Sequence, residues 1–126
     1  DTTNATQTEM LVPVSGGYVT LPRPSSVIVF DGYITAMRHS AGELVAVDSC
    51  YDWGFNVLVS AKSGNGSDAQ IVGDVVLSPR SGLSTSYSVQ IDVVTGSNAR
   101  LRIQVTGASG HNVTWMAYLK IGQSVI

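Results

Sequence analysis

The stretch GHNVTWMAYLKIG, residues 110–122, alternates between apolar and polar side chains almost without a break. A period of two allows a β-strand to turn one set of side chains toward a core and the other set outward. The set predicted to face the core is Val113, Trp115, Ala117, Leu119 and Ile121. The outward set contains Met116 and Tyr118, which are large and mostly apolar. These two residues are therefore candidates for an oligomer interface.

The rest of the chain also reads as β-structure. Runs of β-forming residues alternate with clusters of Gly, Ser, Pro and Asn, and no window holds a sustained helical pattern of apolar residues. Turn signals recur about every 8–14 residues, which is typical of antiparallel β-sandwiches of jelly-roll or Greek-key type. The predicted strand regions are 9–22 with a reversal at Gly16-Gly17, 27–39, 43–61, 69–78, 85–95, 99–107 and 110–122.

Length and composition narrow the class of protein. The 126 residues suit one domain, which we expect to span 1–126, with 1–8 as a flexible N-terminal linker from a longer protein. Charged residues make up only 13% of a chain that is 44% hydrophobic, whereas about 25% charged is usual. This composition indicates a surface partly covered by other subunits.

Charge and cysteine content limit the partners. The net charge is −2 and no Lys/Arg cluster occurs, so we expect no nucleic-acid partner. No apolar run approaches the roughly 18–20 residues of a membrane span. Cys50 is the single cysteine and cannot form a disulfide within the chain, which favours assembly in a reducing compartment.

The sequence offers little for catalysis. His39, His111 and Cys50 do not have the spacing of a zinc site, and no G-x-S-x-G elbow occurs. Asp48 and Asp52 are the carboxylates of closest sequence spacing that share a strand face, yet on an extended strand they lie about 13 Å apart. That separation exceeds the roughly 5–9.5 Å of glycosidase pairs. We therefore expect a non-catalytic domain without metal or cofactor.

The stretch DSCYDWGFN, residues 48–56, combines aromatic rings with carboxylate and amide groups. Such groups bind sugars, because rings stack on the C–H faces of sugars and planar polar groups bond to hydroxyls. The same pattern also fits a central strand in which Trp53 and Phe55 are core residues. The candidate carbohydrate-binding residues are Tyr51, Trp53, Asp48, Asp52 and Asn56, with His39 as an additional polar contact.

The stretches YSVQIDVV (87–94) and ARLRIQVTGASGHNVTWMAYLKI (99–121) resemble the C-terminal domains of bacteriophage tailspikes and tail fibres. Those domains commonly contain a strand of pattern L-x-I-x-V-x-G, a short Gly-Ser-Asn loop and a strand of pattern V-x-W-x-A-x-L/I-x-I. The matching residues here are Leu101, Ile103, Val105 and Gly107, followed by Val113, Trp115, Ala117, Leu119 and Ile121. The stretch FDGYITA, residues 30–36, is similar to an earlier strand of such domains.

This resemblance implies a parallel homotrimer at the distal end of a phage tail, in a virion assembled in the bacterial cytoplasm. Such a domain helps to trimerise the spike and contacts host surface polysaccharide or lipopolysaccharide. A neighbouring subunit would then cover Met116 and Tyr118. No sugar-binding motif of the family transfers residue by residue.

Two other functions remain open from the sequence. The domain could be a purely structural cap for trimerisation and folding, with no ligand. It could also be the carbohydrate-binding module of a polysaccharide-degrading enzyme.

Overall fold

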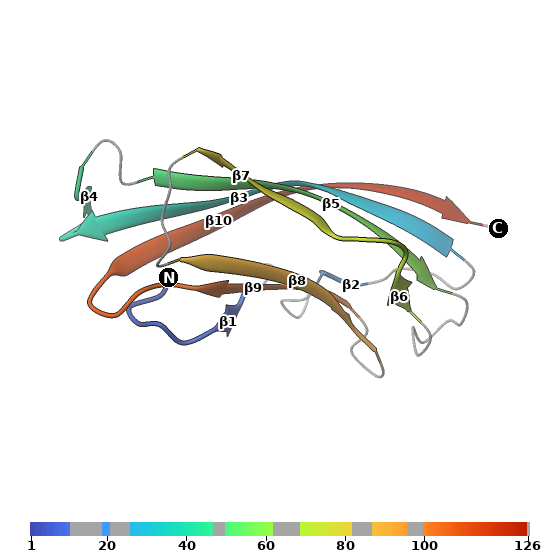
Figure 1. Ribbon diagram of the computed structural model, residues 1–126, viewed down its shortest axis with the longest axis horizontal. Coiled ribbons are helices and arrows are strands. Elements are labelled where there is room, and N and C mark those ends of the chain that lie inside the picture. Colours follow the sequence, from blue (N-terminus) through green and yellow to red (C-terminus); the bar gives the residue numbers. More distant parts are fainter. Residues whose placement is uncertain are drawn as a thin grey trace.

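The computed structural model describes residues 1–10, 19–20, 26–46, 50–61, 69–81, 87–95 and 100–125. These residues form ten β-strands and no helix, so they contain no candidate for a membrane-spanning helix. The strands make two antiparallel sheets, one of six strands and one of four, which face each other (Figure 1). The predicted all-β, antiparallel character is confirmed. The hairpin reversal predicted at Gly16-Gly17 lies outside the described residues.

The six-stranded sheet is built around β3 (Ser26–Ser40). One edge of β3 pairs with β10 (Asn112–Val125) over the whole length of that strand, and the other edge pairs with β5 (Cys50–Ala61). The short strands complete this sheet: β4 (Glu43–Leu44) pairs with β3, while β6 (Gln70–Ile71) and β7 (Val76–Ser81) pair with β5.

The four-stranded sheet is built around β9 (Arg100–Thr106). Its partner on one edge is β8 (Ser88–Val94), and β1 (Thr8–Glu9) and β2 (Val19–Thr20) pair with successive parts of the other edge. The outer face of this sheet is polar.

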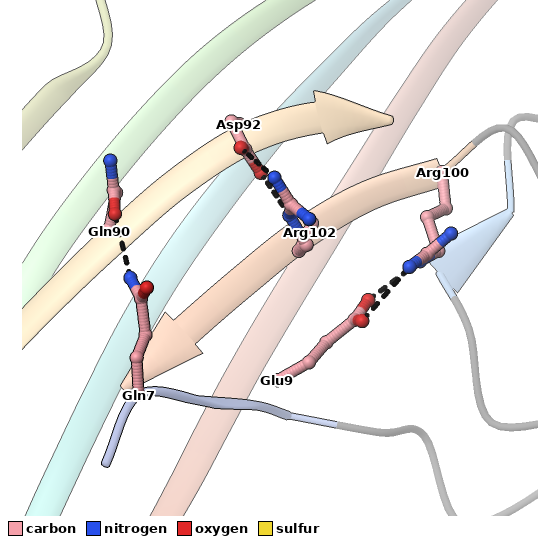
Figure 2. A network of polar contacts seen from close by, with 6 residues as sticks. All are labelled: Gln7, Glu9, Gln90, Asp92, Arg100 and Arg102. Carbon is pink, nitrogen blue, oxygen red and sulfur yellow. Dashed lines mark hydrogen bonds and ion pairs between the residues drawn. The ribbon is translucent and has the colours of Figure 1, made fainter. Parts of the chain in front are cut away.

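Three side-chain pairs link the strands on that polar face (Figure 2). Arg102 donates to Asp92 at 2.7 Å, and this hydrogen bond raises the pKa of the arginine. The other two pairs join the N-terminal segment to the sheet: Glu9 with Arg100, and Gln7 with Gln90.

The core lies between the two sheets and collects the inward side chains of both. In β3 every second side chain from Ile28 to Ala36 is buried, with glycine at position 32. The buried apolar residues that share this core include Phe55, Val57 and Val59 of the neighbouring β5, and Ile91, Leu101, Ile103 and Val105 of β8 and β9 in the other sheet.

The predicted alternation in β10 holds through residue 119. Val113 is fully buried, and Trp115, Ala117 and Leu119 pack against the core. The prediction is wrong for Ile121, which is 53% exposed. In the register Ile121 lies opposite the buried Phe30, toward the C-terminal end of β10, and that end of the strand extends beyond β8 and β9 among the described residues (Figure 1).

Part of the predicted N-terminal linker, residues 1–8, pairs with both sheets. Thr2 forms an antiparallel bridge with Val113 of β10, and Thr8 pairs with Val105 of β9. The segment therefore spans the open side between the two sheets. Its connection to a longer protein stays a prediction.

Gly32 allows β3 and β10 to approach closely in the middle of the large sheet. A Cβ atom at this position would lie 1.8 Å from the backbone carbonyl oxygen of Tyr118. Because that atom belongs to the backbone, it cannot move aside without displacing β10. Gly122, further along β10, has no atom within 4 Å of the corresponding position.

We expect Gly32→Ala to destabilise the fold by about 1–3 kcal/mol or more, as overpacking of a well-packed site does. Gly122→Ala should leave the unfolding free energy within about 0.5 kcal/mol of wild type, as for ordinary surface changes. Urea denaturation of both variants measures the difference. Equal stability of the two variants would contradict the close approach at Gly32.

Candidate functional site

The two aromatic residues predicted to stack on a sugar both face the core. Trp53 is 8% exposed, and its ring stacks on that of Trp115 with a centroid distance of 5.8 Å and an interplanar angle of 25°. Tyr51 is half-buried and packs edge-on against Tyr87 at 5.1 Å. The burial of Trp53 and Phe55 favours the interpretation of these two residues as core residues.

Tyr87 connects these aromatic rings to the loop before β10. Its hydroxyl oxygen lies 2.8 Å from Nδ1 of His111, and its ring also contacts Trp115. Burial raises the pKa of the Tyr87 phenol, and the nearby Tyr51 raises it further. The phenol therefore stays protonated at neutral pH and serves as a structural hydrogen-bonding group.

The predicted polar residues lie on the opposite face of the same sheet. Asp52 is half-buried, Asn56 is exposed, and His39 lies half-buried near the end of β3. The structure therefore separates these side chains from Tyr51 and Trp53, because neighbouring residues of a strand point to opposite faces. Asp48 lies outside the described residues.

An open site instead lies on the outer face of the six-stranded sheet, where β3 and β10 pair. It is a hollow of about 550 Å³ lined by Asp31, Gly32, Tyr33, Tyr118 and Lys120. Tyr33 and Tyr118 lie directly opposite each other in the register, and their rings stack at 6.2 Å with an interplanar angle of 18°. Their exposed fractions are 45% and 60%. The pair is thus an aromatic surface open to solvent.

Polar groups flank the tyrosine pair at the next outward position along each strand. Asp31 and Lys120 are opposite each other in the register, and Asn56 of β5 lies opposite Asp31 on the other side. All three are exposed. They place a carboxylate, an ammonium group and an amide in one row beside the rings. Asn56 is the predicted sugar-binding residue that the structure brings close to this hollow.

The predicted interface residues lie on this same outer face. Met116 is 56% exposed, and Tyr118 is one of the two stacked tyrosines. Val29 of β3 adds a further exposed apolar side chain. Because these side chains are large and exposed, the face provides contact area for a ligand or for another copy of the chain.

A second hollow of about 300 Å³ lies further along the sheet and is lined by Met37, His39, Gly42, Leu44 and Thr114. The Nε2 atom of His39 is buried there and has no hydrogen-bond partner among the residues that the structure describes. Within the described ranges, no group of three or more His, Cys, Asp or Glu side chains is placed to hold a metal ion.

The sequence does not predict that Tyr33 and Tyr118 form one site, although each residue lies in a stretch that the sequence analysis identifies. The alternation places Tyr118 on an outward face, and Tyr33 lies within the stretch FDGYITA. What the sequence does not give is the pairing of β3 with β10, two strands separated by most of the chain. Only that pairing places Tyr33 opposite Tyr118.

Comparison of the chain with protein-family models, with curated proteins and with solved structures finds no significant match. The assignment of a function therefore rests on the residues of this chain and their geometry.

We expect the tyrosine pair to contribute little to folding. Tyr33→Ala and Tyr118→Ala should each cost up to about 1.5 kcal/mol, the scale of one aromatic pair. Trp53→Ala should cost about 3–5 kcal/mol, as a large-to-small change in the core does. Thermal and urea unfolding of the three variants compares these costs. A tyrosine variant as unstable as Trp53→Ala would show that the pair is needed for folding.

Proposed function

We propose that this chain is a non-catalytic attachment domain of the kind found at the distal ends of bacteriophage tailspikes and tail fibres. Its ligand would be host surface polysaccharide or lipopolysaccharide. The observation that carries the proposal is the exposed Tyr33–Tyr118 pair, with Asp31 and Lys120 beside it. Stacked rings can contact the C–H face of a sugar while the charged groups bond to its hydroxyls.

The architecture is compatible with this role. Two antiparallel sheets that share one core support the more specific proposal of a jelly-roll-like β-sandwich. The tyrosine site lies on regular strands instead of loops, so its rings are held in place before a ligand arrives. Such preorganisation reduces the entropy lost on binding.

The expected affinity of one site is low. One or two stacked rings contribute about 0.5–1.5 kcal/mol each beyond buried area, so a dissociation constant of order millimolar is expected for a single site. Three copies in a homotrimer would raise the apparent affinity for a repeating polysaccharide by a factor of about 10²–10⁴. Trimerisation would therefore convert weak single contacts into effective attachment.

The second candidate function is a structural trimerisation cap. It is favoured by the exposure of Met116 and Tyr118 on the outer face, in a chain with few charged residues. A neighbouring copy seated on these residues would bury the tyrosine pair. A glycan and a neighbouring copy would then compete for the same face, so binding and assembly can be separated by experiment.

The glycan proposal predicts that removing a ring weakens binding, while a variant that keeps the ring binds as wild type does. We expect Tyr118→Ala to weaken binding about 10-fold or more and Tyr118→Phe to stay near wild type, because the phenylalanine ring can still stack. The measurement is titration against an array of bacterial surface polysaccharides and lipopolysaccharides, with variants of equal oligomeric mass. Undiminished binding by Tyr118→Ala and Tyr33→Ala would exclude this site, and no binding by wild type would favour the structural cap.

The assembly proposal predicts a trimer of the 13.2 kDa chain in solution. Met116→Asp should weaken the trimer strongly if that face is an interface, because desolvating a charge costs several kcal/mol. Ser88→Asp, an exposed change on the other sheet, is the matched control and should leave the mass unchanged. Light scattering at micromolar concentration measures both. A stable wild-type monomer would contradict the trimer.

A further inference from the structure

We propose that residues 1–10, here called the clasp, are a separable strand seated in an acceptor groove between the two sheets. The groove is formed by the part of the β9 edge that pairs with β1, by Gly107 and Trp115, and by the edge of β10 at Val113. It would be an interaction surface for an extended peptide with the chemistry of the clasp. This inference is independent of the tyrosine site.

Thr2 anchors one end of the clasp. It is 5% exposed, and its backbone exchanges two hydrogen bonds of 2.9 Å with Val113. Its hydroxyl oxygen accepts a hydrogen bond of 2.9 Å from Nε1 of Trp115. A small side chain with an acceptor oxygen is therefore what the groove requires at this position.

Gly107 makes room for that anchor. A Cβ atom there would lie 2.6 Å from the Thr2 hydroxyl oxygen and 3.1 Å from the backbone oxygen of Asn4. Because glycine has no side chain, the clasp occupies the space next to its Cα atom. Any side chain at position 107 would push against the clasp.

The other end of the clasp is held by β9. Thr8 and Glu9 pair with this strand, and the Met10 amide donates to the Ile103 carbonyl at 2.8 Å. The Glu9 carboxylate accepts from Arg100 at 2.6 and 3.0 Å, a two-point ion pair that leaves both side chains mostly buried (Figure 2). This pair lies on the outer polar face of the four-stranded sheet, so β9 binds a carboxylate there, seven residues after the threonine anchor.

The burial pattern indicates that the clasp can leave without unfolding the sheets. Between its two anchored ends, residues 3–7 are exposed. A hollow of about 270 Å³ remains against the clasp, lined by Asp1, Thr2, Thr8, Glu9, Met10, Val105 and Trp115. Segments with few buried apolar contacts open at a lower free energy than the core. The central strands, by contrast, are paired on both edges and bury their inward side chains.

Hydrogen exchange of the wild-type chain tests whether the clasp opens without unfolding of the sheets. The amides of Thr2, Met10 and Val113 are protected by clasp contacts, so each reports clasp opening. We expect them to exchange on the order of 100-fold faster than the slowest amides of β3 and β5, in line with local opening. Exchange at the rate of global unfolding would show that the clasp leaves only when the domain unfolds, and would overturn the proposal.

Peptide uptake tests the groove. The probe is a labelled synthetic peptide of residues 1–10, added to full-length chains. A chain whose own clasp is weakened by Thr2→Ala and Glu9→Gln should bind the peptide. The same chain with Gly107→Val added should not bind it, because the valine side chain occupies the space next to Thr2. A peptide carrying Thr2→Val is the control and should bind at least about 10-fold more weakly. No uptake by the weakened chain, or equal uptake by the Gly107→Val chain, would overturn the proposal.

Discussion

The pairing of β3 along both of its edges is the constraint on which the rest of the structure depends. Twelve of its residues pair with β5 and fourteen with β10. A shift of one residue in either register would exchange the inward and outward side chains of a whole strand. The buried row from Ile28 to Ala36 prevents such a shift, because it would bring Asp31 into the core. The core thereby also determines which side chains are exposed on the outer face.

The candidate site is a consequence of this fixed register. Because Ile34 and Ala36 must be buried, Tyr33 must point outward, and the same rule applied to Trp115 and Ala117 turns Tyr118 outward opposite it. The fold therefore exposes two large rings that it does not need for its own core. Exposed apolar patches often mark interaction surfaces, and this supports the proposed contact with a ligand or another copy.

The period-two pattern was sufficient to predict the all-β class and the inward face of β10 as far as Leu119, because alternation is a local property. It also gave Tyr51 and Trp53 one face and Asp52 and Asn56 the other, yet the predicted sugar site combined both sets. The long-range pairings could not be read from the sequence. These include the Tyr33–Tyr118 contact and the bridge between Thr2 and Val113, whose partners are brought together only by the complete fold.

Strand β10 makes three separate kinds of contact, because a strand at the edge of a sheet has two faces and one edge that is not paired within that sheet. Its inward face completes the core with Trp115, its outward face presents Tyr118, and its edge at Val113 receives the clasp. Core and clasp meet at Trp115, whose ring stacks in the core while its Nε1 binds Thr2. The tyrosine pair shares neither contact. Loss of the clasp should therefore alter the environment of Trp115 while leaving the outward face of β10 in place, so that ligand contact and clasp docking can vary independently.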